Sequence, residues 1–212
     1  MLRTCVYWLA KHLCLIALKL HNKLRVEGLE KIPADRPVIV AANHTSNLDP
    51  VVVGCVFPDR LRPLGKIELF QIHPIFTWLM NNLGVIPVSK ESGATAAAAL
   101  KKFLGLLKDG ESLMIFPEGA RSLDGRLKPL EGGVAVLATN VDAPIVPLYV
   151  AGSFEAMPVG SKKITRHPIV ACFGEPIMPL PKDQRGPLKE ERERIRNTLQ
   201  KELERLEKVS IG

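Results

Sequence analysis

Several common sequence signals are absent from this chain of 212 residues. Its four cysteines form no Cys-x-x-Cys pair, so neither a zinc site nor a disulfide framework is indicated, and reduced cysteines suit a cytosolic compartment. No H-E-x-x-H metal motif and no G-x-S-x-G serine elbow occurs, and the five histidines are scattered. The sequence therefore predicts no metal centre and no serine nucleophile. Its composition, 46% hydrophobic and 24% charged, is that of a globular domain.

Acidic residues are also absent from the first 25 positions, although the whole chain has 22 of them. The same segment carries five basic side chains: Arg3, Lys11, Lys19, Lys23 and Arg25. It accounts for most of the formal net charge of +7. A basic excess confined to one end indicates contact with an anionic surface, and it argues against a nucleic-acid groove across the whole fold.

The basic N-terminal segment contains no uncharged run of about 18 residues, the length that a membrane-spanning helix needs. It also lacks the small-residue cleavage site of a signal peptide. Its apolar residues recur at steps of three and four, as one stripe of a helix: Val6, Leu9, Leu13, Ile16, Ala17 and Leu20. We expect residues 1–25 to form an amphipathic helix that binds an anionic membrane surface, with Lys11 and Lys19 off the stripe and reaching lipid phosphates. A helix packed on the protein core is the alternative.

The remaining residues, 26–212, read as one α/β domain in which short β-branched runs alternate with helical stretches. Such alternation predicts a largely parallel or mixed sheet flanked by helices. The expected strands are 37–42, 85–88, 112–116, 144–150 and 168–173, with 62–65 as a weaker candidate. The expected helices are 68–82, 94–108, 132–141 and 188–208; the last is a charged helix with a narrow apolar seam.

A candidate catalytic pair follows the expected strand 37–42. His44 and Asp49 are five positions apart across a turn that leads into Pro50, a residue suited to the first turn of a helix. If the turn folds back, the carboxylate holds one imidazole nitrogen and leaves the other as a proton acceptor. The alternative is that Asp49 only caps the helix and His44 is a polar loop residue.

A second unusual loop follows the expected strand 112–116. It contains Glu118, Gly119 and Arg121, and the planar guanidinium of Arg121 suits a phosphate group. Taken alone, this loop could be a surface turn with a local Glu–Arg pair.

The two loops together carry a family resemblance. Residues 43–49 (NHTSNLD) match the motif N-H-x-x-x-x-D, and residues 116–122 (FPEGARS) match F-P-E-G-x-R-S. Their order and separation resemble the glycerolipid acyltransferase family, specifically the short bacterial 1-acylglycerol-3-phosphate acyltransferases. Weaker matches are residues 65–70 with 84–88, and residues 143–150. One departure is Lys90, where the family often has an arginine.

The resemblance implies transfer of an acyl group from a thioester to lysophosphatidic acid, giving phosphatidic acid. His44 is then the general base, Asp49 its orienting partner, and Arg121 and Lys66 hold the acceptor phosphate. Glu118 and Gly119 shape the acceptor site, Glu118 by hydrogen bonding to the glycerol part. The acyl donor is acyl-CoA or acyl carrier protein as a co-substrate, with no resident cofactor. We expect a peripheral or monotopic protein at the cytoplasmic face of the membrane. Glycerol-3-phosphate or another lysophospholipid as acceptor, a hydrolase, and a non-catalytic lipid-binding protein are the alternatives.

Overall fold

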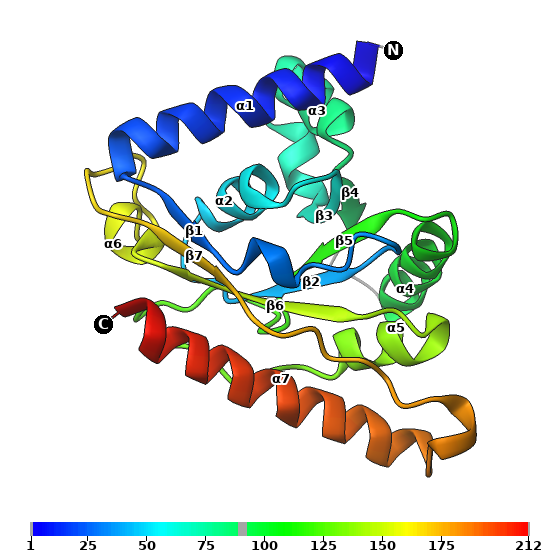
Figure 1. Ribbon diagram of the computed structural model, residues 1–212. Helices are drawn as coiled ribbons and strands as arrows, with labels where there is room; N and C mark the ends of the chain where they lie inside the picture. The colour runs from blue at the N-terminus through cyan, green and yellow to red at the C-terminus, as the bar shows by residue number, and fades with distance from the viewer. Residues whose placement is uncertain (1, 89–92, 212) are drawn as a thin grey trace.

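A seven-stranded sheet forms the centre of the computed structural model, which describes residues 2–88 and 93–211 (Figure 1). Its strand order is β1-β7-β6-β2-β5-β3-β4, and neighbouring strands are parallel except for the antiparallel pair β6 and β7. The strands are β1 (Arg25–Glu27), β2 (Ile39–Ala42), β3 (Leu61–Lys66), β4 (Ile86–Val88), β5 (Ser112–Ile115), β6 (Ile145–Ala151) and β7 (Val170–Phe173). The expected mixed, largely parallel sheet is confirmed.

Each central strand is a short apolar run because helices cover both faces of the sheet. Strands β2 and β7 are buried along their whole length. Five expected strands and the weaker candidate at 62–65 are confirmed, with ends shifted by one or two residues. Strand β1 was not predicted; it is a three-residue edge strand with a single apolar residue, too short to show a periodic pattern.

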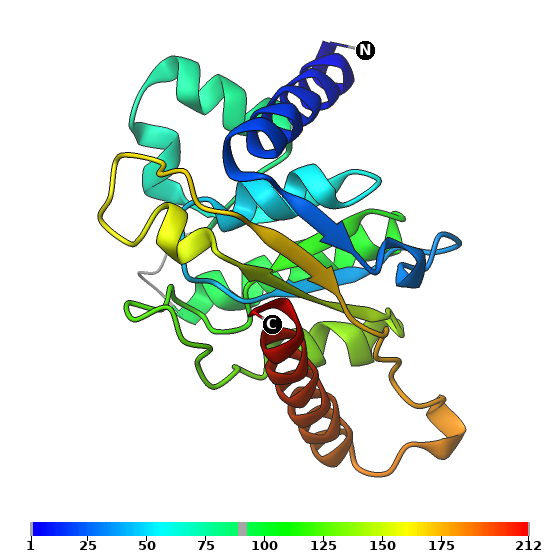
Figure 2. The same cartoon turned by 60° about the vertical axis from the view of Figure 1, so that its left-hand side comes forward.

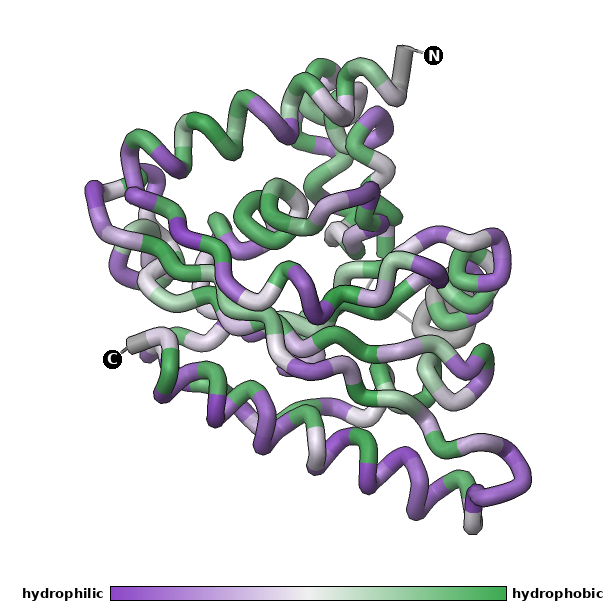
Figure 3. The backbone as a smooth tube through the Cα atoms, in the orientation of Figure 1, coloured by the Kyte–Doolittle hydropathy of each residue, from purple (hydrophilic) through white to green (hydrophobic). Residues whose placement is uncertain are grey.

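The helices lie in two layers on opposite faces of the sheet (Figure 1). One face carries α1 (Leu2–Asn22) and α2 (Asp49–Val56), and the other carries α4 (Gly93–Lys108), α5 (Gly133–Val141) and α7 (Leu188–Ile211). Each layer encloses its own cluster of buried apolar side chains against the sheet. Figure 3 shows hydrophobic segments in the central part of the molecule and also along α1 at its edge, whereas α7 is largely hydrophilic.

The expected helix at 68–82 is wrong in its continuity. A 3₁₀ turn (Ile67–Gln71) is followed by a separate helix α3 (Pro74–Leu83). Pro74 lacks a backbone N–H and forces the preceding residue out of the helical region, so His73 is extended with φ −163°. The His73 side chain then caps α3 by accepting a hydrogen bond from the backbone N–H of Ile75.

The charged C-terminal helix is confirmed, and it extends to Ile211. Its apolar seam of Ile195, Leu199, Leu203 and Leu206 is buried against the sheet and α5. A long helix with so few apolar positions is stable here because that one narrow face packs on the body while the rest meets water.

Helix α1 has two faces with different surroundings. Tyr7, Lys11 and Leu18 are buried against the body, whereas Leu9, Leu13, Ile16 and Leu20 are exposed. The apolar stripe is therefore not the face that packs on the core. Among the described residues, no helix is both long and apolar enough to cross a bilayer.

The expectation that Lys11 reaches lipid phosphates is wrong. Its ammonium donates hydrogen bonds to the backbone carbonyls of Phe57 and Asp59, just after α2, and lies over the Trp8 ring. Burial lowers the pKa of Lys11. Carbonyls left free after the end of α2 favour a buried cation at this point. Lys19, by contrast, is exposed.

Candidate active site

The two motif loops meet at the carboxyl edge of the sheet because β2 and β5 are parallel neighbours. The loop after β2 contains residues 43–48, the loop after β5 contains residues 116–132, and both lie at the same edge of the sheet. The backbone N–H of Ser122 donates to the carbonyl of His44 at 2.7 Å and joins the loops directly. Sequence positions more than 70 apart thus form one site.

Asn43 fixes the point at which the chain leaves β2. Its side chain is fully buried, donating to the carbonyl of Val150 at 3.1 Å and accepting from the N–H of Val150 at 2.7 Å. The amide thereby extends the β2–β6 pairing by one step, so the backbone is free to turn at His44. In the sequence, only the motif match pointed to Asn43. Its hydrogen bonds to Val150 could not be predicted from residue spacing, because the partner lies 107 positions away.

His44 and Asp49 face one another across the turn. The Nδ1 atom of His44 is 3.0 Å from Oδ2 of Asp49, and the Asp49 carboxylate is fully buried. The same Oδ2 accepts the backbone N–H groups of Thr45 and Ser46, each at 2.7 Å. These bonds hold the carboxylate in place, which fixes the ring orientation and leaves Nε2 as the second imidazole nitrogen.

The expected capping role of Asp49 is wrong in detail. Leu48 occupies the N-cap position of α2, and Asp49 is the first helical residue. A turn closed by the Ser46 carbonyl and the Asp49 N–H starts the helix one residue earlier than expected. The Asp49 carboxylate points back to the loop, where it is available to His44.

An aromatic side chain from the second loop completes the surroundings of the imidazole. The ring of Phe116 stacks on His44, with centroids 4.0 Å apart and an interplanar angle of 18°. The imidazole keeps only 17% of its side-chain exposure. Sequence reasoning did not assign Phe116 a role, since a strand-end phenylalanine usually signals core packing.

Glu118 lies between the two loops. Its Oε1 accepts the backbone N–H of His44 at 2.6 Å, its Oε2 accepts that of Lys128 at 3.0 Å, and the residue is 4% exposed. Burial raises the pKa of the Glu118 carboxyl, and the two backbone hydrogen bonds oppose that rise. The geometry is that of a clamp between loops; the expected hydrogen bond to a glycerol group stays a prediction.

Arg121 extends from the second loop to the first, where its guanidinium donates to the side-chain carbonyl of Asn47. A guanidinium has five N–H donors, so this contact leaves donors for an anionic group. Gly119 has φ +69°, and a Cβ placed there would collide with the Glu131 carboxylate. The left-handed conformation and the close approach explain why glycine stands at this position.

The structure places Lys66 at the end of β3, where its backbone pairs with Val88. The description of Lys66 extends to its backbone only. Lys90 lies outside the described residues. The expected contact of Lys66 with the acceptor phosphate therefore stays a prediction.

A cavity of about 590 Å³ opens beside His44. Its wall is largely apolar and comes from the strand ends, α4 and α5; the apolar part includes Leu64, Phe103, Met114, Phe116, Val134 and Leu137. Gly119 and Arg121 lie in the same wall. A pocket of this size with few polar groups suits a ligand with an apolar tail and one anionic end.

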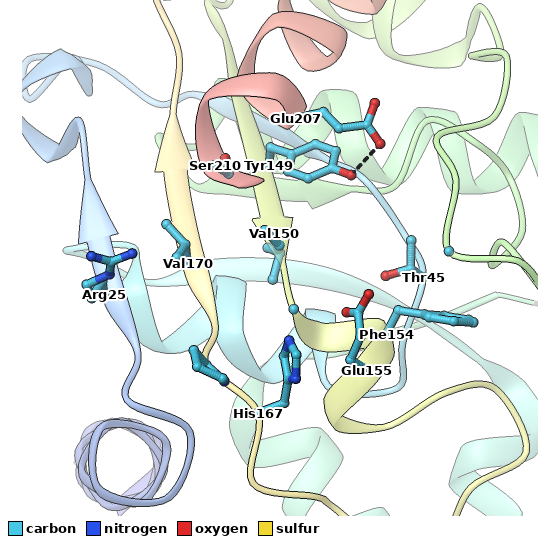
Figure 4. Close-up of a pocket in the computed structure, with 14 residues that line it drawn as sticks. Arg25, Thr45, Tyr149, Val150, Phe154, Glu155, His167, Val170, Glu207 and Ser210 are labelled. Atoms are coloured by element: carbon cyan, nitrogen blue, oxygen red, sulfur yellow. Dashed lines mark hydrogen bonds between the residues drawn. The ribbon is translucent and has the colours of Figure 1, made fainter. Parts of the chain in front are cut away.

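A smaller and more polar cavity of about 310 Å³ lies near the ends of β6 and α7 (Figure 4). Thr45 lines it, and Tyr149 donates a hydrogen bond to Glu207 of α7 at 2.8 Å. Burial first, and then the bond to Glu207, raises the pKa of the Tyr149 phenol. Two neighbouring residues of the loop thus line different cavities: His44 lines the apolar one and Thr45 the polar one.

Comparison with known proteins gives consistent matches. A family model described as Acyltransferase matches residues 23–151. A chloroplastic 1-acyl-sn-glycerol-3-phosphate acyltransferase of Brassica napus is 33% identical over 162 residues, covering 76% of this chain and 46% of that protein. The 1-acyl-sn-glycerol-3-phosphate acyltransferase of Bacillus subtilis is 28% identical over 163 residues, covering 76% and 77%.

A crystal structure gives a match at the level of the fold. The 1-acyl-sn-glycerophosphate (LPA) acyltransferase PlsC from Thermotoga maritima superposes with a TM-score of 0.78 and 25% identity. The match covers 97% of this chain and 81% of that one. The chain spans about half the length of the plant relatives that it matches.

Proposed function

Because the chain belongs to the acyltransferase family, we propose that it moves a fatty acyl group from a thioester to the free hydroxyl of 1-acylglycerol-3-phosphate, forming phosphatidic acid. The observation that carries this proposal is the His44–Asp49 pair, whose Nδ1 and Oδ2 atoms are 3.0 Å apart. His44 lines an apolar cavity whose wall also includes Arg121, and Asp49 is buried behind it. Relatives named for the same activity support it.

In the proposed reaction His44 is a general base. Its Nε2 takes the proton of the acceptor hydroxyl while the hydroxyl oxygen attacks the thioester carbonyl. The tetrahedral intermediate then collapses, the carbon–sulfur bond breaks, and the thiolate leaves with the proton from the imidazolium. Asp49 keeps the ring oriented and stabilises its charged form. A positioned base of this kind typically contributes about 10²–10⁴-fold to the rate.

Arg121 and Lys66 are the proposed ligands of the acceptor phosphate. Support for Arg121 comes from its place in the cavity wall that also includes His44, and from its hydrogen bond to Asn47 on the His44 loop. A guanidinium offers paired donors to phosphate oxygens and holds the hydroxyl at a fixed distance from the base. The acyl donor in this proposal is acyl-CoA or acyl carrier protein, and the apolar wall receives the acyl chains.

We also propose that α1 binds the membrane surface that contains the acceptor. The exposed stripe of Leu9, Leu13, Ile16 and Leu20 supports this role, since four large apolar side chains on one helix face leave much hydrocarbon in contact with water. Helix α3 contacts α1 and adds exposed Ile75 and Trp78. The proposed location is peripheral, at the cytoplasmic face of the membrane.

The experiment that tests the function is an activity matrix on purified protein. The donors are acyl-CoA and acyl carrier protein; the acceptors are lysophosphatidic acid, glycerol-3-phosphate, another lysophospholipid and monoacylglycerol. We expect turnover with lysophosphatidic acid and little with monoacylglycerol, which lacks the phosphate. Thioester hydrolysis that is independent of acceptor would instead indicate a hydrolase, and no turnover at all a lipid-binding protein.

Two variants of Arg121 sharpen that matrix. Arg121→Ala should raise the acceptor KM about tenfold or more, as expected for a lost charge-assisted contact. Arg121→Lys should restore it only in part, because an ammonium cannot form the paired contact. An unchanged KM in Arg121→Ala would remove this residue from the phosphate site.

A further inference from the structure

The loop of residues 157–168, between α6 (Ser153–Ala156) and β7, is strongly basic, and we call it the basic loop. Lys162, Lys163 and Arg166 are exposed, and the sequence has no acidic residue from 156 to 174. Within the described part of the chain, none of the three forms an ion pair. Three neighbouring cations that are not neutralised by ion pairing create a local positive potential that attracts anions.

The basic loop is fastened to the end of α1. The side-chain amide of Asn22 donates to the carbonyls of Thr165 and His167, at 3.0 and 2.9 Å. Figures 1 and 2 both show this loop beside the C-terminal end of α1. Exposed Lys19 and Lys23 lie on either side of Asn22 in the sequence, so the positive charge continues from the loop onto the helix end.

The other end of the basic loop touches the candidate active site. Ser46, which lies between His44 and Asp49, donates its hydroxyl to the carbonyl of Met157 at 2.7 Å. Val159 belongs to the wall of the large apolar cavity. The loop thus connects the C-terminal end of α1 with the cavity beside His44.

We propose that the basic loop is an anionic-headgroup docking site, which binds lipid phosphates on the membrane surface and places the cavity mouth against them. The proposal rests on the membrane role of α1 above. Charge complementarity supports it, and so does Leu20, which is 74% exposed and lies two positions before the loop-binding Asn22. Ile164, 47% exposed among the cations, is an apolar tip of the kind that enters a headgroup layer. An acidic carrier protein would meet the charges but would not account for the exposed apolar side chains of Leu20 and Ile164.

The test compares three variants for sedimentation with vesicles. The first is the triple variant Lys162→Ala, Lys163→Ala, Arg166→Ala. The second is a matched control that removes three exposed charges from α7, on the opposite face of the sheet: Lys189→Ala, Lys201→Ala, Lys208→Ala. The third, Lys162→Arg with Lys163→Arg, keeps the charge. Vesicles are pure phosphatidylcholine, or phosphatidylcholine with one-third phosphatidylglycerol.

We expect the loop triple variant to bind the anionic vesicles more weakly, by about fivefold per charge and up to about a hundredfold in all. Added salt should reduce the wild-type advantage, whereas the α7 control and the arginine variant should bind like wild type. Equal binding of the loop variant and wild type to anionic vesicles would overturn the proposal. An equal loss on neutral vesicles would also overturn it, because the effect would then not be electrostatic.

Measurements of activity and of wild-type vesicle binding distinguish a failure of headgroup docking from a failure of the proposed acyltransferase function or of the proposed membrane role of α1. Neutral detergent micelles carry no anionic headgroups, so the loop variant should have the same turnover there as wild type. If wild type itself shows no turnover in these micelles, the result counts against the acyltransferase function and not against headgroup docking. Failure of wild type to bind any vesicle would count against the membrane role of α1. A loop variant that binds vesicles normally but loses activity only with acyl carrier protein would overturn headgroup docking in favour of a protein contact.

Discussion

At the scale of single residues, the site depends on buried carboxylates that accept backbone hydrogen bonds. Asp49 accepts two N–H groups as well as the His44 ring, and Glu118 accepts one N–H from each loop. Such donors replace the hydrogen bonds to water that a carboxyl group loses on burial. The motif positions therefore hold the loop backbone in place as well as supplying the groups of the proposed reaction.

Replacing Asp49 with Asn tests its orienting role. The amide keeps the size of the side chain but has no negative charge to stabilise an imidazolium. An amide NH₂ at the position of Oδ2 would also face the backbone N–H groups that Oδ2 now accepts. We expect kcat to fall by about 10²-fold or more with little change in acceptor KM. Steady-state kinetics with lysophosphatidic acid would measure this. A variant with near wild-type kcat would show that Asp49 is only structural.

Replacing Glu118 with Gln tests the clamp. One backbone N–H would then face an amide N–H₂, so we expect a loss of about 1–3 kcal/mol in the free energy of unfolding at neutral pH. The exposed Glu190→Gln on α7 is the matched control, with no expected change. Urea unfolding would measure both.

The pH dependence of that comparison has a definite sign. Because burial raises the pKa of Glu118 in the folded state, the native protein binds its proton more tightly than the unfolded chain does. This contribution to stability is fully present below the ordinary pKa and is lost as pH rises through the folded pKa. The stability of wild type relative to Glu118→Gln should thus increase as pH falls from about 7 toward about 4.3. A decrease would contradict the raised pKa.

At the scale of elements, α1 has two faces with different surroundings. Tyr7, Lys11 and Leu18 fasten it to the body, while its apolar stripe faces outward. The sequence predicted the stripe but not which side of the helix would meet the protein. The reason is Lys11: a charged side chain predicts exposure, yet here it binds carbonyls after α2, a partner 46 positions away.

The outward face of α1 predicts a separable membrane function. The triple variant Leu9→Gln, Leu13→Gln, Ile16→Gln should bind vesicles about tenfold or more weakly, since each side chain loses its apolar transfer energy. Its thermal stability should stay near wild type, because exposed positions contribute little to folding. Leu188→Gln with Val209→Gln, on exposed positions of α7, is the control. Unchanged vesicle binding with normal folding would contradict the membrane role.

Other elements show where sequence reasoning succeeds and where it stops. The buried strands and α7 have strong periodic or apolar patterns, and their existence was predicted correctly. The break before α3 depends on the local geometry of Pro74, and β1 depends on pairing with β7, a strand nearly 150 positions away. Neither a local pattern nor the composition shows which distant strand β1 will pair with.

At the scale of the whole molecule, the sheet order brings the chemistry together. Strands β2 and β5 are neighbours in space although they are far apart in sequence, so both motif loops and the apolar cavity share one edge. The sequence identified His44, Asp49, Glu118, Gly119 and Arg121 as candidates. It could not show that Asn43, Phe116 and Ser46 position them, because those contacts exist only after the strands have paired.

The most direct test of the account is the rate of phosphatidic acid formation by purified His44→Ala, with the exposed His12→Ala on α1 as the matched control. The account predicts that His44→Ala folds like wild type but loses about 10²-fold or more of kcat, while His12→Ala keeps wild-type turnover in detergent micelles. Near wild-type turnover by a folded His44→Ala protein would contradict the general-base mechanism.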